Sequence, residues 1–151
     1  MASTTTTPTT AARPLPVPSP LTQPFWEGTR AHKLLLQRCR KCGVFRWTPQ
    51  YLCTACHAEE YDWAETRGRG VIYAFTRVQR PASPAFEAPY VVAVVRLEEG
   101  PLMLTNIVGA EPAVLAIGAP VEVRFEKASD DITLYLFQPA VAGAVRETAP
   151  E

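Results

Sequence analysis

The chain has 151 residues, enough for one medium domain or two small units packed together. It carries 15 basic and 15 acidic side chains, yet residues 28–58 hold six basic groups and no acid, whereas residues 87–151 hold four basic and ten acidic groups. No apolar run approaches the ~20 residues of a membrane span, and the first ten residues lack the basic start and apolar core of a secretory signal. We expect a cytoplasmic protein with a basic N-terminal unit beside an acidic remainder, although solvated surface charge explains the asymmetry equally well.

The first segment in chain order is polar and rich in proline. Residues 1–20 contain six threonines and five prolines and almost nothing to bury, so residues 1–23 are predicted to be a disordered tail. Residues 24–32 then predict a short helix, because Pro24 suits a first helical turn and Glu27 there complements the helix dipole. Ordered structure is expected up to residue 139, and residues 140–151 are predicted to be a flexible tail.

The four cysteines form two matched pairs. Cys39 and Cys42 make one C-x-x-C hook, Cys53 and Cys56 make another, and ten residues separate the two hooks. Such hooks present four thiolates to one ion, which is the ligand set of a closed, tetrahedral zinc site. Gly43 follows the first hook and fits a turn that needs positive φ. The pattern predicts structural Zn²⁺ and leaves no thiol free to act as a nucleophile.

Other interpretations of the cysteines are weaker. Two disulfides are typical of a secreted miniprotein, and a redox C-x-x-C motif usually occurs singly on a βαβ unit. Iron in a rubredoxin-like site uses the same four sulfurs, so the ligand set alone does not separate iron from zinc. The gap between the hooks is nevertheless shorter than the usual zinc spacing and much shorter than that of rubredoxin. We predict zinc, with iron as the alternative.

Short strands surround the two hooks. Residues 34–38 lead into the first hook, residues 44–47 leave it, and residues 61–65 alternate apolar and acidic side chains with the period of a half-buried strand. This arrangement predicts a zinc ribbon, a β unit too small to fold without its metal. Residues 24–67 are therefore predicted to form one unit, with Gly68-Arg69-Gly70 as the boundary turn.

A run of strands follows the ribbon. Turn residues occur at short intervals, notably Glu98-Glu99-Gly100-Pro101 and Ala128-Ser129-Asp130-Asp131. Residues 111–116 are compatible with a single helical turn. The predicted strands are 71–80, 90–97, 102–108, 121–126 and 132–137. Five short strands with a small helix between the third and fourth indicate an OB-fold barrel over residues 68–139, so the chain is predicted to be mainly β.

These segments resemble the DUF35 family, whose members join an N-terminal helix, a rubredoxin-like zinc ribbon and a C-terminal OB-fold. The shared motifs run in order across nearly all of residues 24–139. They are Phe25-Trp26-Glu27-Gly28, Leu36-Gln37-Arg38-Cys39, Cys42-Gly43, the Cys53/Cys56 hook, Gly68-Arg69-Gly70-x-Ile72-Tyr73-x-Phe75-Thr76, Pro89-Tyr90-Val91-Val92-Ala93 and Leu104-Thr105-Asn106. His57 departs from the pattern, since glycine often follows the last cysteine, but this leaves the metal site intact.

The resemblance implies a small, non-catalytic subunit of an acyl-CoA enzyme. Members of the family pair with thiolase-fold proteins, namely thiolases, retro-aldolases and acyltransferases, and the partner's own cysteine and histidine perform the chemistry. The small subunit scaffolds the complex and helps bind coenzyme A. Family resemblance and the prevalence of twofold symmetry together suggest a hetero-oligomer of α2β2 type or larger.

The residues themselves agree with a non-catalytic role. His32 and His57 are the only histidines, and neither has an evident catalytic companion in the sequence. No nucleophile-elbow motif surrounds any serine or threonine. The paired acids Glu98-Glu99 and Asp130-Asp131 lie in turns, where solvated carboxylates are common.

Candidate residues for binding coenzyme A follow the ribbon. Arg67, Arg69, Arg77 and Arg80 continue the basic stretch into the first barrel strand and offer donors for phosphate groups. The rigid, apolar loop that ends at Phe86 is a candidate wall for an acyl or pantetheine channel. Surface charge and ordinary packing under a loop are the alternative explanations.

Candidate residues for a partner interface lie in the helix and the ribbon. Phe25, Trp26, Trp47 and Tyr51 are aromatic side chains that a small ribbon can barely bury, and such residues tend to anchor protein interfaces. The alternative is that Trp47 and Trp63 pack between the ribbon and the barrel, which we expect for at least one of them.

Single-stranded nucleic-acid binding is the alternative function, because a zinc ribbon and an OB-fold both permit it. Such a site needs exposed aromatic rings along a basic groove. Tyr73, Phe75 and Tyr90 are the available rings, and their positions favour the core. The barrel half is also acidic overall, so nucleic acid is not the partner that the sequence favours.

Overall fold

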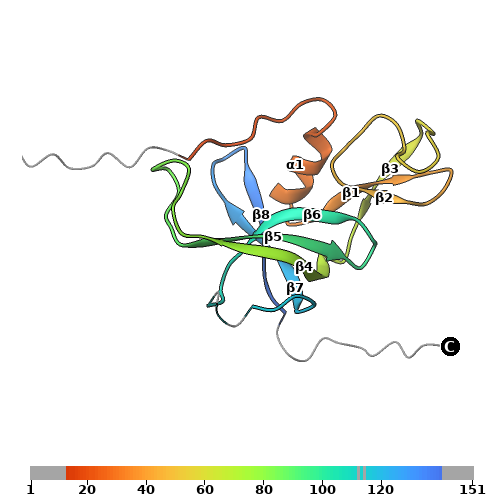
Figure 1. Ribbon diagram of the computed structural model, residues 1–151. Helices are drawn as coiled ribbons and strands as arrows, with labels where there is room; N and C mark the ends of the chain where they lie inside the picture. The colour runs from red at the N-terminus through yellow and green to blue at the C-terminus, as the bar shows by residue number, and fades with distance from the viewer. Residues whose placement is uncertain (1–12, 112, 114, 141–151) are drawn as a thin grey trace, which may run out of the picture.

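The computed structural model describes residues 13–111, 113 and 115–140, and is mainly β (Figure 1). Its described elements are one helix and eight strands: α1 (Gln23–Arg30), β1 (Leu35–Cys39), β2 (Phe45–Arg46), β3 (Tyr61–Glu65), β4 (Arg69–Val78), β5 (Tyr90–Leu97), β6 (Leu102–Ile107), β7 (Pro120–Lys127) and β8 (Thr133–Pro139). Within the described part of the chain, no helix is long and apolar enough to cross a membrane.

The first three strands form the predicted ribbon. They make an antiparallel sheet in the order β2-β1-β3, in which Gln37 pairs with Arg46 and Cys39 pairs with Tyr61. Strand β3 begins and ends where the alternating pattern predicted. Strand β2 has only two residues, fewer than the four expected, because the chain turns toward the second hook directly after Arg46.

The last five strands close into a barrel. Their order is β4-β5-β6-β8-β7, with antiparallel pairs throughout except between β6 and β8, which run parallel. All five predicted strands are present, and β5 matches its predicted bounds at both ends. Gly70 permits the close approach of β4 and β5, because a Cβ there would lie 2.3 Å from the carbonyl oxygen of Arg96. The predicted five-stranded OB-like barrel is therefore confirmed.

Ribbon, helix and barrel share one hydrophobic core. Phe25 of α1 and Leu34 and Leu36 from the start of the ribbon are buried in the same cluster as Ile72 and Phe137 of the barrel. In Figure 1, α1 lies beside β8 and next to β1, between the barrel and the ribbon. The helix therefore packs against both β units and contributes to the core that they share.

The helix differs from its prediction at the first turn. It begins at Gln23, one residue earlier than expected, and has no acidic residue in its first turn. Glu27 instead accepts a hydrogen bond of 2.9 Å from Gln23 Nε2 one turn earlier. The proposed interaction of Glu27 with the helix dipole was therefore wrong, since dipole effects fall off beyond the first turn.

Part of the predicted N-terminal tail has a defined place. A turn forms where the amide of Thr22 donates to the carbonyl of Ser19 at 3.0 Å, immediately before α1. Residues 1–12 and 141–151 of the two predicted tails lie outside the described residues. The predicted helical turn over residues 111–116 also includes two residues outside the description, at positions 112 and 114.

Candidate functional site

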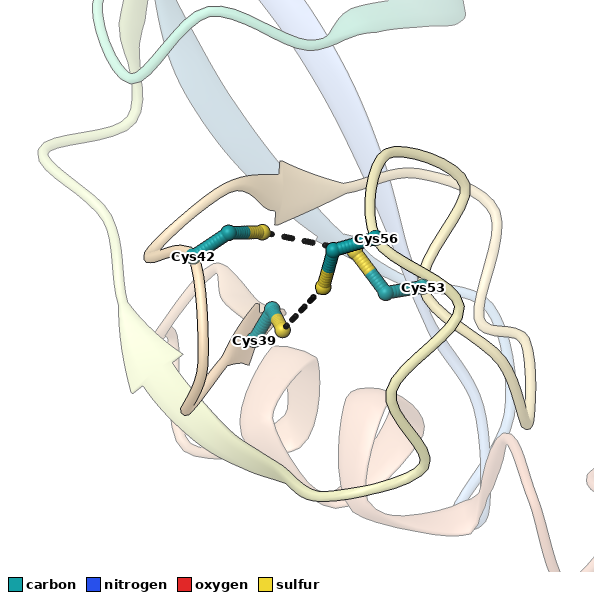
Figure 2. Close-up of side chains that lie close together, drawn as sticks. All are labelled: Cys39, Cys42, Cys53 and Cys56. Atoms are coloured by element: carbon teal, nitrogen blue, oxygen red, sulfur yellow. Dashed lines mark hydrogen bonds between the residues drawn. The ribbon is translucent and has the colours of Figure 1, made fainter.

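The structure brings the four predicted metal ligands together (Figure 2). Cys39 is the last residue of β1, Cys42 lies in the turn between β1 and β2, and Cys53 and Cys56 lie in the loop before β3. All four Sγ atoms lie within 4.8 Å of one another. The Cys39–Cys56 distance is 3.6 Å and the Cys42–Cys53 distance is 3.5 Å, and all four thiols are free.

The two hooks have nearly the same backbone geometry. In the first, the Gly43 amide donates to the carbonyl of Cys39 at 2.9 Å, and in the second, the His57 amide donates to the carbonyl of Cys53 at the same distance. Gly43 has φ 75° and His57 has φ 57°. His57, which stands where glycine often follows the last cysteine, therefore adopts the left-handed conformation that glycine adopts more easily.

Backbone amides lower the pKa of the first cysteine thiol in each hook. The amides of Ala55 and Cys56 lower the pKa of the Cys53 thiol to about 6. The Cys42 amide lowers the pKa of the Cys39 thiol and outweighs the opposing effect of burial. Each first cysteine of a hook thus has its thiolate stabilised, and the thiolate is the form that binds metal.

The cluster fits a tetrahedral metal ion. Four thiolates around Zn²⁺ at ~2.3 Å lie about 3.8 Å apart in tetrahedral geometry, and the shortest S–S distances in the cluster are close to this value. The second hook closes over the first, so four sulfurs complete the coordination and leave no position for substrate. Iron accepts the same ligands.

A second feature is an apolar groove on the barrel. Its volume is about 770 Å³, and side chains from α1, β5, β6, β8 and the loop after β4 line it. Most of the wall is aromatic or aliphatic. The residues used below are Trp26, Phe86, Tyr90, Leu104 and Tyr135, together with Arg13 from the N-terminal segment.

The polar residues that line this groove are Arg13, Glu87, Thr105, Asn106, Glu126 and Tyr135. Arg13 lies over the ring of Phe86, with Cζ 5.2 Å from the ring centroid. Asn106 is already engaged, because its Nδ2 donates to the carbonyl of Val91 at 3.0 Å. Burial raises the pKa of Tyr135 to about 12, so its hydroxyl stays protonated at neutral pH. The aromatic and aliphatic wall therefore suits the apolar part of a ligand, and the carboxylates of Glu87 and Glu126 also line the groove.

Only one of the predicted coenzyme A residues lines the groove. Phe86 is part of its wall and packs near Tyr90, with ring centroids 6.1 Å apart. Arg67 lies elsewhere, 3.2 Å from the carboxylate of Glu98. The remaining predicted residues are exposed on β4 or just after it, and none of them lines the groove: Arg69, Arg77 and Arg80.

The four predicted interface aromatics separate into different environments. Phe25 is only 1% exposed and belongs to the core, so its ring is not available at the surface of this chain. Trp47 packs against Phe25 at 4.6 Å and Tyr135 at 5.4 Å, as expected for a side chain between ribbon and barrel. Trp26 lines the groove, and Tyr51 is 70% exposed.

Some features were not visible in the sequence. Arg13, Leu104 and Tyr135 line the groove, but the first lies in a low-complexity segment and the others are ordinary strand residues. Tyr73 was expected in the core and is instead 47% exposed. Its side chain follows the alternation of β4, in which Gly70 and Ile72 are buried and Val71 and Tyr73 are exposed, and the β-bulge between Ile72 and Ala74 breaks this alternation only after Tyr73.

Comparisons with known proteins agree with this architecture. The ChsH2 rubredoxin-like zinc ribbon domain matches residues 26–62, and the ChsH2 C-terminal OB-fold domain matches residues 63–126. A solved Ltp2-ChsH2(DUF35) aldolase structure is similar, with 36% identity and a TM-score of 0.77 over 84% of this chain and 100% of that chain.

Two curated relatives complete the comparison. A probable enoyl-CoA hydratase alpha subunit from Thermomonospora curvata is 40% identical over 118 residues, 78% of this chain but 37% of that protein, so the chain spans little more than a third of that relative. A DUF35 domain-containing scaffold protein from Methanocaldococcus jannaschii is 31% identical over 62% of this chain and 68% of its own length. With its four-cysteine ribbon joined to a closed OB-like barrel, the chain belongs to the DUF35 family.

Proposed function

We propose that this chain is a non-catalytic, zinc-stabilised subunit that pairs with a thiolase-fold enzyme and supplies one wall of its acyl-CoA site. The groove is the observation that carries the proposal. Its volume of about 770 Å³ is within the range of small-molecule sites, and its wall is mostly apolar. The described residues that line it include no cysteine or histidine, so a reaction there draws its nucleophile from a partner.

The proposal gives each part of the chain a role. The metal holds the ribbon against α1, and α1 presents Trp26 to the groove. The acyl or pantetheine portion of the ligand contacts the aromatic wall. Arg77 and Arg80 are exposed at the end of β4, which leads into the loop of Phe86, so they are candidates for the phosphates of coenzyme A. The chain's relatives support the same role, since their names are those of acyl-CoA enzyme subunits, an aldolase and a scaffold protein.

Native mass spectrometry of tagged protein purified from its own host tests the pairing and the metal together. We expect one zinc per chain and a stable complex with a thiolase-fold protein in equal numbers. Recovery of the chain alone, or with nucleic acid, would contradict the proposal. Iron in place of zinc would change the metal but leave the pairing intact.

A matched pair of variants tests the groove. Leu104 is 60% exposed and lines it, whereas Ile117 is 71% exposed and is not among the residues lining it. Leu104→Asp is expected to weaken acyl-CoA binding by the purified complex at least ~10-fold, because a carboxylate would enter an apolar wall. Ile117→Asp should leave binding unchanged. Equal binding by both variants, measured by calorimetry, would remove the groove from the proposal.

The exposed ring of Tyr73 supports the second candidate function, single-stranded nucleic-acid binding. Arg96 Cζ lies 4.7 Å from the centroid of that ring on the outer face of the barrel, a pairing that also occurs where bases stack. The exposed side chains around it, Val71, Leu102 and Leu104, are aliphatic and suit a protein partner better. Fluorescence anisotropy with labelled single-stranded DNA tests this second candidate function. Salt-sensitive binding that Tyr73→Ala abolishes would favour nucleic acid.

A further inference from the structure

The ribbon contains a buried cation without a hydrogen-bond acceptor among the described residues. Arg46 on β2 is 4% exposed, and its Nε, Nη1 and Nη2 atoms all lack a partner. Gln37, which pairs with Arg46 across the sheet, is 0% exposed, and its Nε2 lacks an acceptor too. Burying a guanidinium is unfavourable unless an opposite charge or an acceptor lies close by. Two adjacent buried donors therefore call for a nearby negative group.

The sheet register places Arg46 on the metal side of the ribbon. Side chains two residues apart on a strand share a face, so Gln37 and Cys39 point to the same side of β1. Tyr61 on β3 pairs with Cys39, and the guanidinium of Arg46 lies 5.1 Å from the centroid of the Tyr61 ring. Because β1 lies between β2 and β3, the side chain of Arg46 crosses over β1 beside Cys39.

The second hook covers the same face. The amide of Gln50, which precedes Cys53 in the loop, donates to Oε1 of Gln37 at 2.8 Å. Leu34 and Leu36 lie on the opposite face and pack into the core shared with the barrel. Arg46, Gln37 and the two buried cysteines, Cys39 and Cys53, therefore lie on the same side of the ribbon sheet, toward the second hook, whereas Cys42 is exposed.

Four thiolates around one divalent ion carry a net charge of −2. On the side of the cluster formed by the buried Cys39 and Cys53 this charge is less screened than at the exposed Cys42, so a buried cation there interacts with it more strongly than one on the surface. We infer that Arg46 is the buried counter-charge of the metal–tetrathiolate centre and that Gln37 adds a second, neutral donor. This inference relies on the metal of the proposed function and assigns residues outside the ligand set that set its affinity.

Zinc affinity is the direct test, measured on the full chain by competition with a chromophoric chelator. Arg46→Gln removes the charge and should weaken zinc binding 10- to 100-fold, the usual effect of removing a group that supports metal ligands. Arg46→Lys keeps the charge and should stay within about threefold of the wild type. Arg124→Gln makes the same change in net charge at an exposed site on β7 and should have no effect.

The Co²⁺-substituted forms provide a second measurement. Absorption bands of tetrahedral cobalt–thiolate should be the same in the wild type and in Arg46→Gln, because all four ligands remain. Weaker zinc binding with an unchanged spectrum supports the inference. Equal affinity in wild type and Arg46→Gln, or an equal loss in the Gln and Lys variants, would overturn it. A wild type that binds no metal would instead refute the metal of the proposed function, and with it the inference.

Discussion

At the scale of single residues, the two hooks share one backbone conformation after their second cysteine but place different residues there, Gly43 in the first and His57 in the second. Gly43 and His57 both adopt positive φ and both donate to the first cysteine of their hook. A side chain in this conformation costs roughly 1–2 kcal/mol, because Cβ approaches the following carbonyl oxygen. Glycine avoids that cost in the first hook, whereas histidine bears it in the second. The closed metal cluster holds His57 in place despite the strain.

One substitution at each of these two positions should reveal this strain. His57→Gly is expected to raise the free energy of unfolding of the zinc-bound protein by about 1 kcal/mol, less a small entropic loss. Gly43→Ala should lower it by a similar amount, since no atom lies closer than 4.0 Å to the added Cβ and only φ opposes the change. Denaturant unfolding in excess zinc measures both. A lower stability of His57→Gly would contradict this account.

Phe25 is the residue whose predicted role the structure changes most. Its ring contacts Trp47 and Tyr135 and is almost fully buried. Phe25→Ala should therefore lower the free energy of unfolding by about 3–5 kcal/mol. Tyr51→Ala, at an exposed position in the same predicted set, should change it by less than about 0.5 kcal/mol. Thermal unfolding followed by circular dichroism distinguishes a core role from a surface role.

At the scale of elements, the ribbon depends on its metal while contributing to the barrel. Strands β1–β3 form a small sheet with a two-residue edge strand, which supplies little folding free energy by itself. Yet Leu34 and Leu36 enter the core that contains Ile72 and Phe137. Loss of the ribbon therefore exposes one side of the barrel core, although the barrel closes through its own hydrogen bonds.

Zinc removal should separate these two contributions. With a strong chelator, amides of β1–β3 are expected to lose protection from hydrogen exchange, because metal binding supplies most of the ribbon's folding free energy. Amides of β5 and β6 should stay protected while the melting temperature of the barrel falls. Cys56→Ala should reproduce this pattern without chelator. Full ribbon protection in the chelated protein would show that the metal is not structural.

At the scale of the whole molecule, the exposed apolar side chains of the described residues include two groups, apart from Val17, Val44, Tyr73 and Ile117. One is the outer barrel face, with Val71, Leu102 and Leu104, and the other is the end of the ribbon, with Tyr51 and Leu52. Several ribbon cations are paired with acids, as in Lys33–Glu65 and Arg67–Glu98, so the basic surface is partly neutralised. An uncovered aromatic beside an aliphatic side chain is a common interface anchor.

The end of the ribbon is therefore the place to weaken the complex without weakening the fold. The double variant Tyr51→Ala with Leu52→Ser is expected to reduce affinity for the proposed thiolase-fold partner at least ~10-fold, as loss of an aromatic anchor typically does. Its melting temperature should match that of the wild type, since both side chains are exposed. Surface plasmon resonance against the partner measures the affinity. Unchanged affinity would place the interface on the barrel face instead.

By itself, the sequence determined the parts whose signals are local. The spacing of the cysteines specified the metal cluster, the alternation along residues 61–65 specified one strand with its bounds, and an apolar run ended by turn residues specified the strand at residues 90–97. Turn residues and the order of strands were enough for the OB-like barrel, because these depend on neighbours in the chain.

Only the tertiary structure decided which aromatic and charged side chains lie together. Phe25 and Trp26 are adjacent, yet one fills the core and the other lines the groove, because the packing of α1 on β8 sets the rotation of the helix. Tyr73 lies on the outward face of β4, and strand register brought Arg46 to the metal side of the ribbon. These outcomes depend on contacts between distant segments, which no spacing along the chain encodes.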